Sequence, residues 1–207
     1  LYPHQLYVLN QWEKEDTMMV VTKTGSGKTA TACLPLFLQE KSAAVFVYPT
    51  NALIADQEAS IRGLAENQLG MKTRVITPEN IHGKDAGEDL ELARIDAHQL
   101  ELFRKALKLN DKASALLRLL QPPGKGCKII LINPDILYLL YSLRYGRNSV
   151  EALAYLQHYQ TMVIDEFHLY WGLELANILF LTYLVRKMKA FKKILLLSAT
   201  PDEGVMD

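Results

Sequence analysis

Residues 17–29 read Thr-Met-Met-Val-Val-Thr-Lys-Thr-Gly-Ser-Gly-Lys-Thr, an apolar run that leads directly into a glycine-rich turn. Small residues in such a turn let successive backbone N–H groups close around phosphate oxygens at the positive end of the following helix. Lys28 would then reach the β- and γ-phosphates of a nucleotide, and the Thr29 hydroxyl would bind Mg²⁺. The strict phosphate-loop pattern has Gly six positions before the lysine, where this chain has Thr22. The residues expected to hold the phosphates are Thr24, Gly25, Ser26, Gly27, Lys28 and Thr29.

Apolar runs of similar length recur along the chain, and each precedes a longer segment with apolar residues spaced as on one face of a helix. The runs are nearly continuous, which is typical of parallel strands that helices cover on both faces. This alternation predicts an α/β fold with a doubly wound sheet. The predicted strands are 17–23, 43–48, 73–77, 128–132, 161–164 and 193–197, and the predicted helices are about 28–40, 51–69, 135–143, 150–159 and 173–189.

Residues 79–125 interrupt the alternation. They contain no run that reads as a strand, and residues 88–120 are charged and leucine-rich, with apolar positions at i, i+3 and i+4. Pro122-Pro123-Gly124 would end this helical pattern. We therefore predict a helical insertion over about 79–125. Its simplest role is to cover one edge of the sheet, and the alternative is a segment that binds a partner or guides a polymer strand.

Length and composition limit the classes of protein to which the chain can belong. Its 207 residues suit one large domain, or one domain with an insertion. With 49% hydrophobic and 22% charged residues it can build a core, which excludes a disordered or collagen-like chain. Lys+Arg and Asp+Glu both number 23, so a nucleic-acid contact would have to come from a local patch or from backbone amides.

Cysteine usage and hydropathy indicate the compartment. Cys33 and Cys127 lie far apart and outside any metal-ligand spacing, which predicts a reducing compartment with neither a disulfide framework nor a zinc site. No apolar run reaches the roughly 20 residues that span a bilayer, and the N-terminus lacks a secretory pattern. We expect a cytoplasmic protein with no membrane partner. The ends at Leu1 and Asp207 suggest a piece of a longer polypeptide.

A pair of carboxylates follows the predicted strand 161–164. An Asp at the end of a buried strand beside a phosphate loop can bind Mg²⁺ through water, which is the role expected for Asp165. Glu166 would orient and deprotonate an attacking water. The alternative is a solvated strand end with no catalytic role. Lys28, Asp165 and Glu166 are thus candidate catalytic residues, and Thr29 and Asp165 are candidate metal ligands.

Five elements in this order resemble the motifs of superfamily 2 helicases of the DEAD/DEAH-box type, in the Asp-Glu-x-His branch. They are the loop 22–29, Pro49-Thr50-Asn51, Asn133-Pro134-Asp135, Asp165-Glu166-Phe167-His168 and Ser198-Ala199-Thr200. The resemblance implies a RecA-like P-loop NTPase, a three-layer sandwich with a mostly parallel sheet, over residues 1–207. It also implies that a second RecA-like domain, which would carry motifs four to six and an arginine finger, is absent from this chain.

The same resemblance assigns further roles by position. Gln5 in Tyr2-Pro3-His4-Gln5 resembles the glutamine that reads adenine, and a Gln amide can both donate to and accept from that edge. His168 joins the catalytic group, and Ser198 and Thr200 would couple nucleotide state to movement. The segments after the second and fourth predicted strands would contact the backbone of one nucleic-acid strand, through Thr50, Asn51, Asn133 and Asp135. For Asn51 and Asp135, ordinary helix capping is the alternative.

The implied activity is ATP-dependent translocation along single-stranded DNA, with ATP and Mg²⁺ as cofactors. An arginine finger contributes on the order of 10³–10⁵ in rate in related enzymes, so the fragment alone would bind ATP, hydrolyse it poorly and unwind nothing. A phosphate-loop kinase or transferase is a weaker alternative. A non-hydrolysing interaction module that docks through 79–125 is an alternative of another class.

Two stretches suggest a narrower group. Residues 49–57 and 165–170 resemble the helicase of type I CRISPR interference, in the type I-D, cyanobacterial form. The chain has no adjacent His-Asp pair, so the metal-dependent nuclease often fused to such helicases would reside on a separate subunit. The implied partners are a CRISPR effector complex and that nuclease subunit. Asn-Pro-Asp-Ile-Leu at 133–137 also resembles a motif of DNA repair helicases, which is the alternative within the class.

Overall fold

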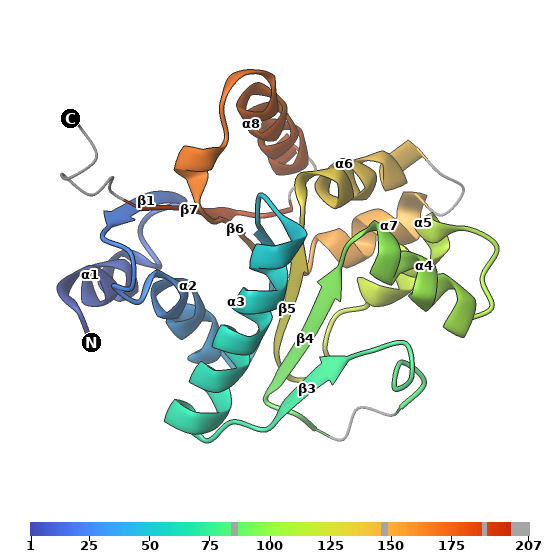
Figure 1. Ribbon diagram of the computed structural model, residues 1–207, viewed down its shortest axis with the longest axis horizontal. Helices are drawn as coiled ribbons and strands as arrows, with labels where there is room; N and C mark the ends of the chain where they lie inside the picture. The colour runs from blue at the N-terminus through green and yellow to red at the C-terminus, as the bar shows by residue number, and fades with distance from the viewer. Residues whose placement is uncertain (84–86, 146–148, 188–189, 200–207) are drawn as a thin grey trace.

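Seven parallel strands form one central sheet in the computed structural model, which describes residues 1–83, 87–145, 149–187 and 190–199 (Figure 1). Their order across the sheet is β1-β7-β6-β2-β5-β4-β3, and each neighbouring pair is parallel. The strands are β1 Thr17–Thr22, β2 Lys41–Val47, β3 Thr73–Ile76, β4 Leu90–Ile95, β5 Gly126–Ile132, β6 Thr161–Ile164 and β7 Lys193–Ala199. The predicted α/β fold with a parallel sheet is confirmed.

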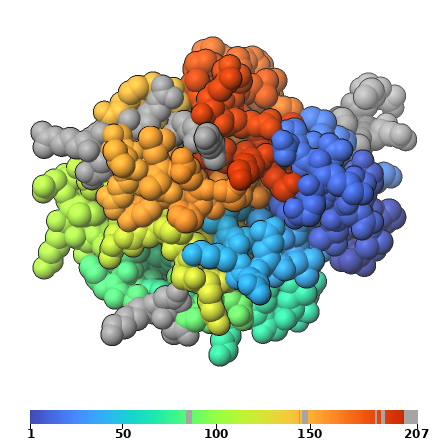
Figure 2. All heavy atoms as spheres, turned by 180° about the vertical axis from the view of Figure 1, so that it is seen from behind, coloured from blue at the N-terminus to red at the C-terminus, as the bar shows by residue number. Residues whose placement is uncertain are grey.

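Helices cover both faces of this sheet and complete three layers (Figure 1). One layer consists of α1 Pro3–Gln11, α2 Lys28–Phe37 and α3 Asn51–Gly63, which continues as the π-helical turn η1 Leu64–Gln68. The other consists of α4 Ala97–Ala106, α5 Lys112–Leu119, α6 Pro134–Ser142, α7 Ser149–Leu156 and α8 Gly172–Lys187, with the short 3₁₀ turns η2 Leu143–Tyr145 and η3 Phe167–Leu169. Figure 2, seen from behind, shows the orange and red segments of α7 and α8 on this second layer.

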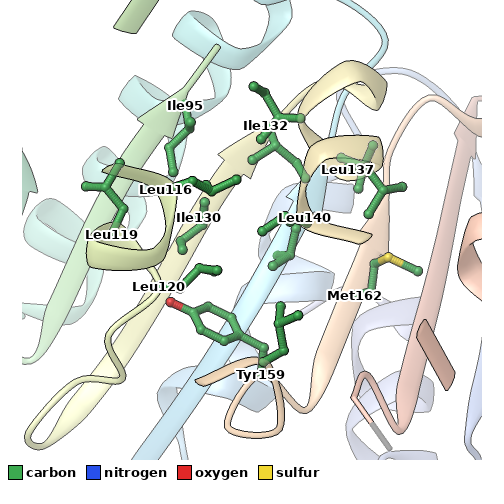
Figure 3. Packing of buried hydrophobic residues seen from close by; sticks show 14 of the residues in the cluster. Ile95, Leu116, Leu119, Leu120, Ile130, Ile132, Leu137, Leu140, Tyr159 and Met162 are labelled. Atoms are coloured by element: carbon green, nitrogen blue, oxygen red, sulfur yellow. The ribbon is translucent and has the colours of Figure 1, made fainter. Parts of the chain in front are cut away.

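Two hydrophobic clusters fill the spaces between sheet and helices. The larger lies under the second layer, where Ile130 and Ile132 of β5 meet Leu116 of α5 and Leu137 of α6 (Figure 3). The smaller lies under α1, α2 and α3. Cys33 and Cys127 belong to the smaller cluster as buried free thiols.

The six predicted strands are present, each within two residues of its predicted ends. The five predicted helices are also present, although two of them end about three residues early and the helix from Asn51 changes to π-helical geometry at Leu64. Residues 188–189, at the end of the last predicted helix, lie outside the described residues. The agreement follows from the near-continuous apolar runs, since strands covered on both faces have few polar positions.

The predicted absence of a strand within residues 79–125 is wrong, because β4 lies there and pairs with both β3 and β5. Its Glu91 stands in register with Arg74 of β3 and Lys128 of β5, and the side chains form ion pairs at 3.6 Å on both sides. Charges at positions 91 and 94 gave the run a helical spacing. The charge at 91 is instead paired across three neighbouring strands, so this stretch is an integral part of the sheet.

The rest of the stretch is helical, as predicted. Asp96 caps α4, because its Oδ1 accepts hydrogen bonds from the backbone N–H groups of His98 and Gln99, each at 2.8 Å. Asp111 caps α5 in the same way through the N–H of Ser114 at 2.7 Å. Asp is a favoured N-cap residue, since its oxygen satisfies N–H groups that have no partner within the helix. The two helices therefore follow β4 as the covering layer of one strand–helix–helix unit.

Candidate nucleotide site

The strand order brings the predicted motifs to one edge of the sheet. β1 leads into the loop 22–29, β6 leads into Asp165, and β7 lies between these two strands and carries Ser198 near its end. The carboxyl ends of parallel strands are the usual place for ligands in open α/β sheets. Segments that are far apart in the sequence therefore meet in front of β1, β7 and β6.

The loop 22–29 has the conformation that a phosphate cradle requires. Gly25 and Gly27 have φ angles of +74° and +79°, in the left-handed region that favours glycine, and Gly27 is the N-cap of α2. A Cβ on Gly27 would also lie 2.7 Å from Nε2 of Gln5. Thr22, at the position of the strict glycine, ends β1, and its hydroxyl is 2.6 Å from that of Ser26. That hydrogen bond closes the loop without a glycine at position 22.

Gln5 connects α1 to this loop. Its side chain is buried, its Nε2 donates to the carbonyl of Gly27 at 3.2 Å, and its Oε1 accepts from the N–H of Tyr2 at 2.8 Å. These bonds fix the orientation of the amide, while one Nε2 hydrogen and one Oε1 lone pair can still serve a ligand. The geometry suits the adenine-reading role, which stays a prediction.

A cavity of about 980 Å³ opens in front of the loop and continues between α2 and α3. Small-molecule pockets measure roughly 300–1,000 Å³, so a nucleoside triphosphate has room here. Gly25, Lys28, Thr29, Gln5, Asp165 and Glu166 contribute to its walls. Lys28 is buried at the first position of α2, where its ammonium group and the helix N-terminus both favour an anion. The residues present therefore fit a nucleotide whose phosphates lie against the loop.

Asp165 and Glu166 form the acidic wall of the cavity. Asp165 is 3% exposed, and burial raises the pKa of its carboxyl to about 6 despite the opposing charge of Lys28. Its Oδ1 accepts a 2.7 Å hydrogen bond from the N–H of Glu166. Glu166 has a φ of +49°, which strains a residue with a side chain, and such strain gathers at functional sites. Oε2 of Glu166 is buried and makes no hydrogen bond within the described part of the chain.

His168 links this acidic wall to β7. Its Nδ1 accepts a 3.3 Å hydrogen bond from the N–H of Ala199 and lies 3.2 Å from the Ser198 hydroxyl. The same nitrogen is 3.4 Å from Oε2 of Glu166. The structure therefore brings together Glu166 and His168, which were expected to be catalytic, and Ser198, which was expected to couple nucleotide state to movement. Thr200, the other expected coupling residue, lies outside the described residues.

The four expected nucleic-acid contacts lie at the ends of β2 and β5, which are neighbours in the sheet. Nδ2 of Asn133 donates to Oδ1 of Asn51 at 3.0 Å. The caps are Thr50 for α3 and Asn133 for α6, so the alternative that Asn51 and Asp135 are the capping residues is wrong. Asp135 is exposed in the first turn of α6, where a negative charge stabilises the helix dipole. We refer to Thr50, Asn51, Asn133 and Asp135 as the polar edge.

The sequence profile described as DEAD/DEAH box helicase matches residues 2–207. This chain belongs to the DEAD/DEAH box helicase family. The match covers nearly the whole chain, and its span contains the loop 22–29, the acidic pair Asp165-Glu166 and the four residues of the polar edge. The parallel sheet, the phosphate loop after β1 and the acidic pair after β6 agree with this assignment.

Curated relatives of the helicase domain are distant in sequence. The ATP-dependent helicase HRQ1 of Saccharomyces cerevisiae (strain ATCC 204508 / S288c) is 22% identical over 176 residues, which are 83% of this chain and 13% of that protein. The uncharacterized ATP-dependent helicase YprA of Bacillus subtilis (strain 168) is 23% identical over 188 residues, which are 86% of this chain and 20% of that protein. The chain thus spans a fifth or less of the length of these relatives.

Solved helicase structures share the fold. The DUF1998 helicase MrfA, crystallised with DNA and AMPPNP, superposes with a TM-score of 0.63 at 20% identity, over 98% of this chain and 24% of that chain. The Pyrococcus furiosus Hef helicase domain superposes with a TM-score of 0.52 at 17% identity, over all of this chain and 34% of that one. The predicted RecA-like sandwich is confirmed.

Thr29 and Asp165 are the expected metal ligands of the helicase domain, and both line the cavity. Within the described residues, no cluster of three His, Cys, Asp or Glu side chains could hold a metal by itself. A hydroxyl and one carboxylate fit Mg²⁺, which typically takes one or two carboxylates and completes its shell with phosphate oxygens and water. The residues present therefore suit a metal that arrives with the nucleotide.

Gln57 is a cavity residue for which the sequence predicted no role. Its Oε1 accepts a 2.8 Å hydrogen bond from the Thr29 hydroxyl, so α3 is connected directly to the first turn of α2. The only sequence signal was its position at the end of the stretch 49–57, which was used for the subfamily resemblance alone.

Among the helices of the described residues, none has the length and apolar composition to cross a membrane.

Proposed function

We propose that this chain is the ATP-binding lobe of an ATP-dependent DNA translocase or helicase. The convergence of the phosphate loop after β1, Glu166 after β6 and Ser198 near the end of β7 carries this proposal, because β1, β7 and β6 are adjacent strands. Family membership supports it, because the motifs occupy one connected site. Single-stranded DNA and a second RecA-like domain of the parent protein are the proposed partners.

The residues of the site divide the chemistry between them. The loop 22–29 and Lys28 would bind the phosphates, Thr29 and Asp165 would hold Mg²⁺, and Gln5 would orient the adenine ring. Mg²⁺ would supply charge neutralisation of the phosphate oxygens. Glu166 orients the attacking water and accepts its proton, for which its buried Oε2 is suited. His168, held by Ser198 and the N–H of Ala199, connects this wall to β7.

The polar edge is proposed to contact the sugar–phosphate backbone of one DNA strand. Its amides, its Thr hydroxyl and the two helix N-termini can bind phosphates without reading bases, which is how a chain with no net charge can bind a polyanion. The second lobe would close on the same strand and supply an arginine finger. The isolated chain is therefore expected to bind ATP and to hydrolyse it poorly.

Steady-state ATP hydrolysis by the parent protein, with and without single-stranded DNA, tests this proposal. We expect DNA to stimulate hydrolysis and Lys28→Ala to abolish it. Release of inorganic phosphate to water, with no phosphorylated acceptor, separates this activity from a phosphate-loop kinase. Absence of DNA stimulation in the folded parent protein would contradict the proposal.

An interaction module that does not hydrolyse ATP is the alternative of another class. Deletion of residues 88–120 cannot test it, because that deletion removes β4 from within the sheet. Substitutions on the exposed faces of α4 and α5, such as Lys105→Glu and Lys112→Glu, leave the sheet intact. Loss of complex assembly with unchanged hydrolysis would favour docking through these helices.

The most specific part of the proposal concerns the biological process in which the parent protein acts. The stretches 49–57 and 165–170 support target DNA unwinding in type I-D CRISPR interference, with an effector complex and a separate nuclease subunit. Residues 133–137 support DNA repair as the alternative. None of the four relatives named above carries a name that refers to CRISPR. Copurification of CRISPR RNA with the parent protein supports the first setting, and DNA-damage sensitivity of a deletion strain supports the second.

A further inference from the structure

The hydrogen bond between Thr29 and Gln57 has an unusual direction for a helical threonine. Threonine hydroxyls in helices commonly donate back to a carbonyl one turn earlier, as Thr31 does to Gly27 at 3.0 Å. Thr29 instead donates across the cavity wall to Oε1 of Gln57, a residue 28 positions later in α3. The Thr29 hydroxyl therefore has its single hydrogen committed to one acceptor on another helix.

This direction matters for metal binding. A hydroxyl binds a cation through an oxygen lone pair, so its hydrogen must point away from the cation to another acceptor. The Gln57 Oε1 atom is such an acceptor, 2.8 Å from Thr29 Oγ1. Partners of this kind, one shell away from a metal, orient the ligands and commonly change metal affinity 10–100-fold when removed.

The position of Gln57 is fixed by the packing of α3. Ile54 and Ile61 precede and follow Gln57 by three and four residues, both are fully buried, and all three therefore share the inner face of the helix. α3 packs against α2, so the amide is held against the first turn that carries Thr29.

We propose that Gln57 is a positioning residue that orients the Thr29 hydroxyl for Mg²⁺. This inference rests on the proposed function, in which Thr29 is a metal ligand. Gln57 itself touches neither the metal nor the phosphates in this role. It increases the affinity that Mg²⁺ adds to ATP binding and leaves the metal-free affinity for ATP unchanged.

Calorimetric titration of ATP into this chain, in EDTA and in saturating MgCl₂, measures that gain as a ratio of two dissociation constants. Gln57→Leu keeps the size of the side chain and removes the acceptor, so we expect the ratio to fall about tenfold while binding in EDTA stays within twofold. Gln57→Glu keeps an acceptor oxygen and is expected to retain the ratio. Gln99→Leu on α4 is the matched control and should behave as the unmodified chain.

Three results would overturn the inference. The first is an unchanged ratio of the two dissociation constants in Gln57→Leu. The second is an equal loss of ATP binding in EDTA, which indicates a general structural role. The third is an equal fall of the ratio in Gln57→Glu. Should Gln57→Leu fail to fold, Gln57→Glu and Gln57→Asn, which shortens the reach of the amide, still separate acceptor placement from packing. If the unmodified chain binds ATP without any gain from Mg²⁺, the proposed function fails together with this inference.

Discussion

The nucleotide site and the polar edge lie at the same end of the sheet, yet their polar groups are treated in opposite ways. In the nucleotide site, Asp165 is buried with a raised pKa, Glu166 has a strained backbone, and the buried Oε2 of Glu166 has no hydrogen bond among the described residues. At the polar edge, Thr50 and Asn133 cap helices, and Asn51 bonds to Asn133. Catalysis requires polar groups that are strained or lack hydrogen-bond partners, as in the nucleotide site. Polar groups whose hydrogen bonds are already made, as at the polar edge, can only bind a ligand that adds further hydrogen bonds.

The largest expected effect concerns Glu166. Glu166→Gln in the parent protein removes the proposed base that accepts the proton of water, so DNA-stimulated hydrolysis should fall by roughly 10²–10⁴-fold. ATP binding should be retained, because the phosphate loop is unchanged. Rates and ATP affinities measured side by side check both statements. If the rate of hydrolysis falls by less than tenfold, Glu166 is not the catalytic base. The strained geometry of the nucleotide site would then have no counterpart in catalysis.

Gly27→Ala tests the strain in the loop. The φ of +79° disfavours a residue with a Cβ, and that Cβ would lie 2.7 Å from Nε2 of Gln5. We expect the free energy of unfolding to fall by about 2 kcal/mol, most of it from the left-handed backbone. Chemical denaturation of the chain measures it. The matched control is Gly63→Ala inside α3, where the Cβ has ordinary space and the change should be small or stabilising.

Asp165→Asn tests the buried charge. Because the pKa of Asp165 is raised from 3.8 to about 6 in the folded chain, its protonated form stabilises the fold, and that stabilisation is lost as the pH rises through about 6. At pH 7 without nucleotide, the Asn variant should therefore be more stable, by about 3 kcal/mol. The difference should shrink toward pH 4. A difference that does not depend on pH would contradict the assignment of the raised pKa.

Asn51→Ala at the polar edge should have the smallest effect on the fold. Asn51 is exposed and is not the cap of α3, so the free energy of unfolding should change by less than about 0.5 kcal/mol. Affinity of the parent protein for single-stranded DNA should fall several-fold and equally for different base sequences, because the proposed contact is to the backbone. Thr50→Ala, which removes the cap of α3, should lower the free energy of unfolding by about 1 kcal/mol, as measured by chemical denaturation.

Local sequence patterns predicted most of the fold and part of the site. Apolar runs located six strands, and the loop 22–29 and Asp165-Glu166 located the cavity, because strand ends in a parallel sheet share one edge. β4 was missed since Glu91 is paired across the sheet by Arg74 and Lys128, a condition that only the strand order creates.

Contacts between distant segments were beyond the reach of pattern reading. The bond from Thr29 to Gln57 depends on how α2 and α3 pack, and no spacing rule connects these residues. The contact of His168 with Ser198 depends on β7 lying between β1 and β6. The left-handed backbone of Glu166 is imposed by its surroundings rather than by its residue type.

Binding of Mg²⁺ and ATP to this chain by calorimetry tests the central claim most directly. The account predicts saturable binding of one ATP, retained in Glu166→Gln and abolished in Lys28→Ala, with both variants folded as judged by thermal unfolding. Binding that survives in folded Lys28→Ala, or no binding by the unmodified chain, would contradict the assignment of the cavity as the ATP site.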